Sequence, residues 1–415
     1  MMALQHVRAC LLACLATALV AAHSDAESTE TADSSRSPTL DRARNLSERA
    51  RRIQRRRQFT ARGVPYGVTG IPFAVVTADR DWGIGGRIHF TDLQRAPFRY
   101  KLTASWVRDP RTGDRYLLRW LAPRIADTDM GLLLVADLGR SHGRFYGFGN
   151  SSLRHHPLLS TRYDIDRRNL TAQLRRWLSR QLWFGIGTSW RDAGISVPTG
   201  PNVLATSLPG QLGSTQTVSV SVALAWDTRD DPSHPDDGVL HSWSMGQVAP
   251  DLAGALGDPP GRRWTISDLR YYPFAKRYLL VLRHLFEVVN GTLPLDMYGE
   301  LGDPERTVRG VGGDGSIRGY APNRFQDDVR FLTSTEVHRH LGSTYWLRQY
   351  LEWRLVGFID AGRVWHHLSQ VRPGRLHSGM GAGVRVIWDE DFVVRLEVAR
   401  SSEDRVAFVK LSRSY

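Results

Sequence analysis

The chain has 415 residues and a formal net charge of +13, which comes almost wholly from arginine because lysine occurs only at positions 101, 276 and 410. Both cysteines, Cys10 and Cys14, lie in the first 26 residues, which excludes disulfides, thiolate metal sites and cysteine nucleophiles from the rest of the chain. No apolar stretch beyond residue 26 reaches the ~20 residues of a membrane-spanning helix, so a chain that crosses a membrane here must form a closed barrel.

Residues 1–26 are predicted to be a secretory signal peptide. Arg8 precedes an apolar run, and Ser24-Asp25-Ala26 offers small residues at a cleavage site. A lipoprotein cleavage box at Leu11-Leu12-Ala13-Cys14 is the weaker alternative, because it leaves only five residues of apolar core after Arg8. Export removes nucleic acid as the partner that a strongly basic chain would otherwise suggest. It favours anionic lipid, lipopolysaccharide or a barrel lumen instead.

Residues 27–69 are predicted to form a disordered and basic periplasmic linker. Its beginning is rich in Ser, Thr, Glu and Asp, a composition that cannot bury enough apolar surface to fold. The following segment, 41–58, holds eight arginines. Leu46, Ala50 and Ile53 fall at helical spacing there. A short amphipathic helix at the membrane surface or in a lumen is therefore the alternative to a solvated linker.

From about residue 70 to the end, stretches of roughly ten residues alternate between apolar and polar positions and are divided by Gly-, Pro- and Asp-rich turns. This period of two is typical of transmembrane barrel strands. Between 218 and 226, for example, Val, Leu and Trp alternate with Ser and Ala. A soluble sandwich is the alternative, but the face opposite its core is seldom so rich in small residues. We predict an all-β fold, a sixteen-stranded antiparallel transmembrane β-barrel over residues 70–415.

The alternation places sixteen expected strands, with ends given to within a few residues. They run near 71–78, 82–92, 97–108, 114–124, 129–140, 161–173, 180–191, 215–227, 237–248, 262–273, 277–290, 330–340, 351–365, 378–388, 391–400 and 404–415. Tryptophan and tyrosine gather at strand ends, as in the aromatic girdle of an outer-membrane barrel. They are Trp183, Trp190, Trp243, Trp264, Tyr271 and Tyr272.

The longest segment between predicted strands, 291–329, is glycine-rich and contains the tip Arg318-Gly319-Tyr320. Long loops without regular structure are usually functional or disordered. In the first predicted strand after this segment, 330–340, Glu336 points inward by parity. In the second, 351–365, Asp360 interrupts an apolar run and also points into the lumen. An arginine held away from water needs a carboxylate partner. On these residues alone, a solvated loop arginine remains the favoured alternative.

The first and last predicted strands must meet if the barrel closes. Pro72 lies in the first strand and cannot donate a hydrogen bond to a neighbour. The last strand ends on the aromatic Tyr415, but Lys410 and Arg413 interrupt the apolar lipid face expected of it. We therefore predict a weakly paired seam between 71–78 and 404–415, which could open and pair with an incoming strand.

Five motifs between residues 70 and 415 resemble those of the outer-membrane assembly-factor and bacterial surface-antigen superfamily, which includes BamA, TamA and the two-partner secretion transporters. They are FYGFGN (145–150), WDTRDDPSHPDDG (226–238), GSIRGY (315–320), FIDAGRVW (358–365) and HSGMGAGVRV (377–386). The resemblance implies a sixteen-stranded barrel whose sixth extracellular loop folds inward. It implies a lumenal lock in which Arg318, with Gly319 and Tyr320, binds Asp360, with Glu336 as a second acid.

The chain departs from this superfamily before its barrel. Members usually carry periplasmic POTRA domains that receive client polypeptides, but only about 43 residues separate the predicted signal from the first strand. That length is too short for one such domain. The departure puts the recruitment of client polypeptides in question. It does not affect the prediction of a barrel.

Motifs for catalysis are absent from the sequence, which holds no GxSxG, HExxH or P-loop pattern. We therefore predict no enzymatic activity, no cofactor and no metal. The pair His366-His367 is interpreted as an exposed turn rather than a metal site. The aspartates between 227 and 237 lack the spacing of an EF-hand and are interpreted as a polar barrel turn rather than a calcium loop.

Two functions remain open at this point. The leading hypothesis is an integral outer-membrane barrel that assists insertion or translocation of polypeptides. The alternative is a plugged structural or partner-binding barrel with no such activity, and a diffusion porin is disfavoured if the loop fills the lumen. The expected partners are outer-membrane lipid and lipopolysaccharide, with client polypeptides or a separate periplasmic subunit.

Overall fold

The computed structural model describes residues 66–76, 82–92, 100–109, 113–125, 128–152, 154, 158–232, 234–298, 300–302, 307–346, 349–372, 374–388 and 392–412. The predicted signal peptide, most of the predicted linker, and Arg413 and Tyr415 of the predicted seam lie outside these residues. Within them, no helix is long and apolar enough to cross a membrane.

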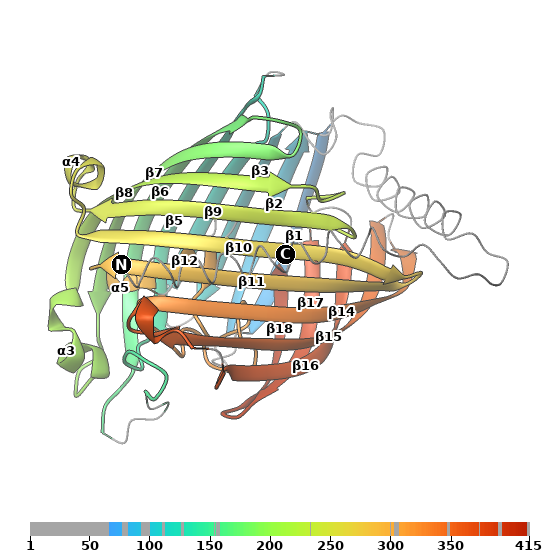
Figure 1. Ribbon diagram of the computed structural model, residues 1–415. Helices are drawn as coiled ribbons and strands as arrows, with labels where there is room; N and C mark the ends of the chain where they lie inside the picture. Colours follow the sequence, from blue (N-terminus) through green and yellow to red (C-terminus); the bar gives the residue numbers. More distant parts are fainter. Residues whose placement is uncertain are drawn as a thin grey trace.

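Long antiparallel strands account for most of the described residues (Figure 1). In chain order they are β1 (Tyr66–Val76), β2 (Trp82–Asp92), β3 (Tyr100–Asp109), β4 (Gly113–Ala122), β5 (Met130–Arg144), β6 (Arg162–Trp177), β7 (Leu182–Ser196), β8 (Gly213–Asp227), β9 (Gly238–Ala249), β10 (Gly261–Ala275), β11 (Tyr278–Gly291), β14 (Val329–Trp346), β15 (Gln349–Trp365), β16 (His377–Trp388), β17 (Phe392–Ser401) and β18 (Arg405–Ser412).

Smaller elements lie in the connections between these strands. β12 (Glu300–Gly302) and β13 (Thr307–Arg309) form a separate two-stranded sheet. The helices are α3 (Val203–Ser207), α4 (Leu252–Leu256) and α5 (Leu295–Tyr298), and the 3-10 turns are η1 (Pro209–Gln211) and η2 (Leu368–Gln370). Figure 1 shows α3, α4 and α5 at the same end of the sheet. The α-helices of the described connections therefore lie at one end of the sheet.

Nearly every long strand pairs with its neighbours in the sequence. β14 pairs with β11, so the residues between them, 292–328, leave the sheet and return to it. The sheet curls until β1 neighbours β18, where Val76 lies opposite Val409. The all-β antiparallel architecture is therefore as predicted, and the segment 292–328 is the longest connection between neighbouring strands of the described sheet.

Strand ends differ from the predicted ones by several residues. β1 begins at Tyr66 rather than near 71, and β14 extends to Trp346 rather than to about 340. The longer β14 depends on an irregularity between His340 and Gly342, beyond which pairing with β15 continues to Trp346 opposite Gln349. A bulge absorbs an extra residue without ending a ladder. Alternation of apolar residues alone cannot predict this, because the bulge shifts the period.

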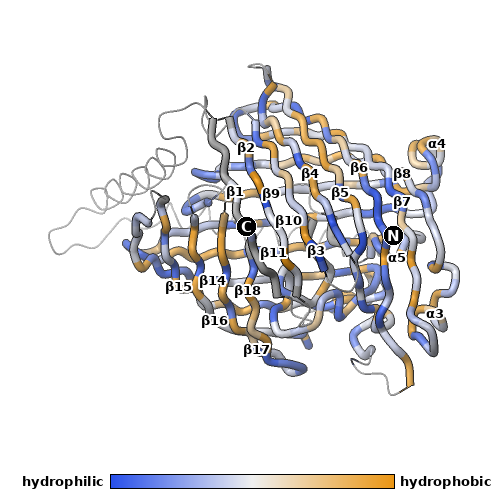
Figure 2. The backbone as a smooth tube through the Cα atoms, turned by 180° about the vertical axis from the view of Figure 1, so that it is seen from behind, coloured by the Kyte–Doolittle hydropathy of each residue, from blue (hydrophilic) through white to orange (hydrophobic). Residues whose placement is uncertain are grey.

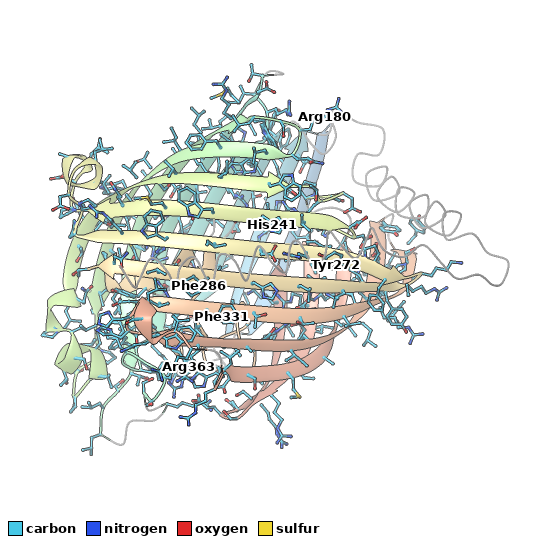
Figure 3. The ribbon with its side chains drawn as sticks, in the orientation of Figure 1. Arg180, His241, Tyr272, Phe286, Phe331 and Arg363 are labelled. Carbon is cyan, nitrogen blue, oxygen red and sulfur yellow. The ribbon has the colours of Figure 1, made fainter. Side chains whose placement is uncertain are left out.

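The alternating pattern corresponds to two chemically different faces of the sheet. On β15, Leu355 is 43% exposed and Ile359 is 58% exposed, whereas Val356, Phe358 and Asp360 between and beside them are buried. Apolar and hydrophilic positions succeed each other along the strands in Figure 2. In Figure 3, Tyr272, Phe286 and Phe331 lie on the neighbouring strands β10, β11 and β14. The outer face is thus apolar, as lipid contact requires.

The enclosed face is covered partly by the excursion 292–328. A buried apolar cluster joins this segment to the walls formed by β11, β14 and β15. Its members are Leu285, Val311, Ile317, Tyr320, Phe325, Leu332 and Val364. Because Leu285, Leu332 and Val364 belong to strands and the others to the excursion, the segment lies inside the curled sheet.

Candidate functional site

The tip of the inward segment is a tight turn built around glycines and one serine. Gly312 and Gly313 have φ of 109° and 107°, a left-handed backbone that residues with a side chain rarely adopt. Ser316 Oγ donates to the Gly310 carbonyl at 2.8 Å and accepts from the Gly312 amide at 2.9 Å. These bonds give the tip a fixed shape, with Arg318 at its end.

Arg318 contacts Asp360 of β15 through a two-pronged ion pair. Arg318 Nε lies 2.6 Å from Asp360 Oδ2, and Nη2 lies 2.7 Å from Oδ1. The Arg318 amide also donates to Oδ2 at 3.1 Å, and Ser334 Oγ of β14 donates to Oδ1 at 2.6 Å. The Arg318 side chain is 2% exposed and that of Asp360 is 0% exposed. The structure therefore brings together the two residues that the sequence singled out.

Two further carboxylates approach the same guanidinium. Arg318 Nη1 lies 2.8 Å from Glu336 Oε1 of β14 and 3.1 Å from Glu397 Oε2 of β17. The Arg318 guanidinium carbon also lies 3.4 Å from the ring centroid of Phe358, close enough for a cation–π contact. Glu336 is thus placed beside Arg318, where the resemblance located a second acid, whereas Glu397 was not among the predicted site residues.

Two wall arginines complete the buried network. Arg385 of β16 contacts Glu336 through Nη2 at 2.8 Å and Glu397 through Nε at 2.9 Å. Arg395 of β17 contacts Glu397 through Nη2 at 2.7 Å. Sequence reasoning missed Arg385, Arg395 and Glu397. The signal that could have found them is their position among small or polar residues on the inward parity of β16 and β17.

The network balances three arginines against three carboxylates. His338 adds an imidazole Nε2 that lies 2.7 Å from Glu336 Oε2. Burying a charge costs several kcal/mol unless a partner and hydrogen bonds satisfy it. Because Arg318 comes from the loop while all three carboxylates come from strands, withdrawing the loop tip would leave excess negative charge inside the sheet.

Glycines on the wall allow the tip backbone to approach closely. A Cβ at Gly379 of β16 would lie 1.9 Å from the Arg318 carbonyl oxygen. Gly319 itself has φ of 96°, and a Cβ there would lie 2.8 Å from the Ser401 amide nitrogen. Neither separation is tolerable for a carbon atom. Both glycines therefore serve the contact between the tip and the β16–β17 wall.

The hairpin of β17 and β18 also binds the tip. Ser401 Oγ donates to the Gly319 carbonyl at 2.8 Å, and the Tyr320 hydroxyl lies 2.9 Å from Ser402 Oγ. Lys410 Nζ of β18 lies 2.7 Å from Asp314 Oδ2 of the loop. The expectation that Lys410 interrupts the lipid face is therefore wrong. Val409 is 39% exposed on the outer face, and strand alternation turns its neighbour Lys410 inward.

The base of the inward segment is bound to a different part of the wall. Arg191 Nη1 of β7 lies 2.6 Å from Asp296 Oδ2 in α5, and Arg167 Nε of β6 lies 3.9 Å from the same oxygen. Arg263 of β10 donates to the Met297 carbonyl at 2.5 Å. Asp296 is 0% exposed. The inward segment is therefore bound to the wall at two places, which are its base at α5 and its tip at Arg318.

Tyr298 closes the base against the end of the segment. Its hydroxyl donates to Asp328 Oδ1 at 2.9 Å, and Arg330 donates to its carbonyl at 2.5 Å. Burial raises the pKa of the Tyr298 hydroxyl, and the neighbouring Asp328 carboxylate raises it further. The phenol therefore keeps its proton at neutral pH and remains a donor.

The remaining predicted residues lie apart from this network. Pro72 of β1 is exposed and pairs with Gly86 of β2. In the polar turn after β8, Asp227 contacts Arg229 at 2.6 Å and Asp236 contacts Arg354 at 2.9 Å. His366 and His367 pack against each other with ring centroids 4.4 Å apart.

Comparison with known proteins agrees with this architecture. The Omp85 superfamily domain matches residues 112–398. The structure is similar to BamA from Haemophilus ducreyi lacking POTRA domains 1-3, with a TM-score of 0.54 and 11% identity, covering 84% of this chain and 70% of that one. It is also similar to CdiB from Escherichia coli, with a TM-score of 0.54 and 13% identity, covering 85% of this chain and 63% of that one. No curated protein sequence matches the chain.

These matches carry different weights. At 11% and 13% identity the two solved structures support the fold alone, and the chain spans less than two thirds of CdiB. The family match covers most of the described sheet, together with the inward segment, strands β14 to β16 and most of β17, and it ends before β18. Barrels of this family reside in the bacterial outer membrane and are not enzymes, as predicted for this chain. The chain therefore belongs to the Omp85 superfamily, and it is an outer-membrane β-barrel protein.

Proposed function

We propose that this protein is a closed, sixteen-stranded barrel that assists the insertion or translocation of polypeptides at the outer membrane. The proposal joins the family, which is associated with those activities, to one observation about the sheet. Within the described residues, β1 pairs with β18 where Val76 lies opposite Val409. A closed order of strands is consistent with that pair.

The β1–β18 pairing, which within the described residues is registered at Val76 and Val409 alone, carries the proposal. β1 pairs with β2 from Tyr66 to Val76, and β18 pairs with β17 from Arg405 to Ser412. Pro72 of β1 also offers no amide proton to a neighbouring strand. Unpaired backbone groups on a strand edge are a template for another strand, so a client strand could add to β1 or β18 when the seam opens.

A disulfide across the seam tests this function. Val76→Cys with Val409→Cys places cysteines on facing positions of β1 and β18. The matched control is Leu396→Cys with Val409→Cys, which keeps one cysteine in place and links β18 to its other neighbour, β17. Both natural cysteines, Cys10 and Cys14, lie in the predicted signal peptide, so each variant produced from residue 27 onward contains only its two introduced cysteines.

The readout is folding of a small outer-membrane barrel protein added in urea to lipid vesicles that contain each variant. The oxidised seam variant should slow folding of this probe several-fold, and reductant should restore the rate. The control variant should give the same folding rate of the probe whether it is oxidised or reduced. Equal activity of the oxidised and reduced seam variants would show that lateral opening is not used, and the structural-barrel alternative would then replace the proposal.

We further propose that Arg318 and Asp360 lock the inward segment in the lumen, with Gly319, Tyr320 and Glu336 supporting the lock. The two-pronged contact at 2.6 and 2.7 Å and the burial of both side chains support this role. Arg318→Cys with Asp360→Cys should crosslink in intact outer membranes. Failure of the well-folded double variant to crosslink would contradict the lock.

The alternative function is a plugged structural or partner-binding barrel without insertase or transport activity. The double anchoring of the inward segment favours it, because Asp296 at the base and Arg318 at the tip both form buried ion pairs. A plug fixed at two ends leaves less freedom for traffic through the lumen. It does not restrict traffic through the seam, and the disulfide experiment distinguishes the two functions.

The proposed organisation comprises a signal peptide at 1–26, a basic periplasmic linker at 27–69 and the barrel at 70–415. The proposed partners are outer-membrane lipid and lipopolysaccharide on the apolar outer face, and client polypeptides or a separate periplasmic subunit at the seam. The basic composition of 41–58, with its eight arginines, supports contact of the linker with anionic lipid.

A further inference from the structure

Three side chains with metal-binding atoms meet where the inward segment rejoins the sheet. Asp327 and Asp328 end the segment, and His366 follows the last residue of β15 (Trp365), three positions beyond Arg363, which is labelled in Figure 3. One ligand atom from each of the three lies within 4.8 Å of the others. The group belongs neither to the Arg318 network nor to the proposed seam.

The register of the sheet explains why these residues are close. Val329 of β14 lies opposite Trp365 of β15, so the positions that continue the two strands are Asp328 and His366. His366 Nδ1 lies 3.2 Å from Asp327 Oδ1 and 3.6 Å from Asp328 Oδ2. The cluster is therefore fixed by strand pairing rather than by a chance approach of two flexible loops.

Neighbouring bonds hold both sides of the cluster in place. The Asp328 carbonyl accepts from the Val289 amide of β11 at 2.8 Å, and its Oδ1 accepts from the Tyr298 hydroxyl at 2.9 Å. The Asp328 amide donates to Asp327 Oδ1 at 3.1 Å, which orients that carboxylate. On the other side, Asn150 Nδ2 donates to the Val364 carbonyl at 2.7 Å. The two carboxylates of the cluster thus accept orienting hydrogen bonds from their surroundings.

We propose that Asp327, Asp328 and His366 form a binding site for a divalent transition-metal ion of the Zn²⁺ type. Imidazole nitrogen and carboxylate oxygen are both ligands of Zn²⁺, whereas Ca²⁺ and Mg²⁺ prefer oxygen alone. At ligand distances of ~2.1 Å, tetrahedral geometry separates ligand atoms by ~3.4 Å. The separations of 3.2 and 3.6 Å from His366 Nδ1 bracket this value.

Charge and exposure also suit an ion. Two carboxylates neutralise a divalent cation when the imidazole is neutral. The Asp327 side chain is 8% exposed, while that of His366 is 64% exposed, so the site has a protected side and a side open to water. An ion could enter from solvent and keep water in its remaining positions. The experiment below separates ion binding from a histidine that shares a proton with two carboxylates at the same distances.

The test uses the full chain in detergent micelles after treatment with EDTA and dialysis, and Zn²⁺ alone is titrated by calorimetry. His366→Ala removes the nitrogen ligand from an exposed position, so the variant should fold. His367→Ala is the matched control, because this exposed neighbour lies outside the group of three. Asp327→Asn with Asp328→Asn removes the negative charge while retaining side-chain shape.

The unsubstituted chain and His367→Ala should each bind one equivalent of Zn²⁺. The affinity of His366→Ala and of the double asparagine variant for Zn²⁺ should be at least tenfold lower. A large excess of Ca²⁺ should not displace it. Zn²⁺ should also raise the thermal unfolding midpoint of the unsubstituted chain and the control, but not that of His366→Ala. Equal Zn²⁺ binding and equal thermal shifts in all variants would overturn the proposal, as would displacement by Ca²⁺. This site does not depend on the proposed function.

Discussion

The tip and the base of the inward segment are bound to the wall with opposite polarity. At the tip the segment supplies a cation, Arg318, to carboxylates on β14, β15 and β17. At the base it supplies an anion, Asp296, to Arg191 and Arg167 on β7 and β6. Reversing the segment would place like charges together at both ends, which is unfavourable in a low-dielectric interior. Charge therefore favours the placement in which the tip faces β14, β15 and β17 and the base faces β6 and β7.

The two ends also differ in how their charges are balanced. The tip belongs to a network in which each carboxylate contacts more than one donor, and Glu397 contacts Arg318, Arg385 and Arg395. The base has one carboxylate between two arginines whose side chains are 10% and 14% exposed. We expect the tip to be the more costly end to break, because water reaches its partners less easily.

The largest effect is expected from Arg318→Ala. Removal of the guanidinium leaves Asp360, Glu336 and Glu397 with excess negative charge in a buried site. Breaking a buried pair in this way typically costs ~3–5 kcal/mol. The free energy of unfolding should fall by about that amount in urea titrations followed by the gel shift between folded and heat-denatured barrel.

Arg318→Lys is the control for this change. It retains the charge but loses the planar fork that grips Asp360 with two nitrogens, so its loss should be smaller. An alanine variant as stable as the unsubstituted chain would show that the segment is not held by this contact.

A smaller loss is expected from Asp296→Asn at the base. The substitution keeps the side-chain shape and removes the charge opposite Arg191 and Arg167. Because these arginines retain some exposure, water can compensate in part, and we expect a loss of about 2 kcal/mol in the same titrations.

Asp258→Asn is the matched control for the base. Asp258 also faces an arginine, with its carboxylate 3.3 Å from Arg262, but its side chain is fully exposed to water. Such surface pairs contribute little, so this variant should unfold like the original. A base variant indistinguishable from this control would mean that the tip alone holds the segment.

Close approach of the tip to the wall is tested by Gly379→Ala. The added Cβ would meet the Arg318 carbonyl oxygen, so the tip or β16 must shift, and overpacking of this kind costs about 1–3 kcal/mol. We expect a lower unfolding midpoint and faster proteolysis of the segment. Gly357→Ala on β15 is the control, because a Cβ there meets no atom within 4 Å. Equal effects of the two alanines would contradict the close approach.

The sequence predicted the strands well because a lipid-facing barrel strand must alternate between apolar and polar residues. Arg318 stood out because glycines surround it, and Asp360 because it interrupts an apolar run. Arg385, Arg395 and Glu397 also interrupt apolar runs, but nothing in the sequence pairs them with Arg318. A charged residue at an inward position looks the same in sequence whether it is hydrated or paired, since pairing depends on how β14 to β17 are placed in register.

The direction of Lys410 was also beyond the sequence. Its parity can be assigned only when a neighbour such as Val409 is known to face lipid. The apolar residues of β18 do not settle this, because Val406 and Phe408 are buried inside while Val409 is exposed outside. Both faces of this strand carry apolar side chains where the inward segment covers the wall. Alternation of apolar and polar residues therefore does not identify the lipid-facing side of β18.

The smallest effect is expected from Lys410→Ala, which breaks the contact between the inward segment and the last strand. The Lys410 and Asp314 side chains are 31% and 17% exposed. Partly exposed pairs of this kind contribute less than about 1 kcal/mol, and salt weakens them. We expect a small decrease in the free energy of unfolding at low salt that disappears at high salt. Because the Arg318 network is buried, its contribution should persist at high salt. A Lys410→Ala effect that is large and independent of salt would instead place this pair among the main anchors of the segment, beside Arg318.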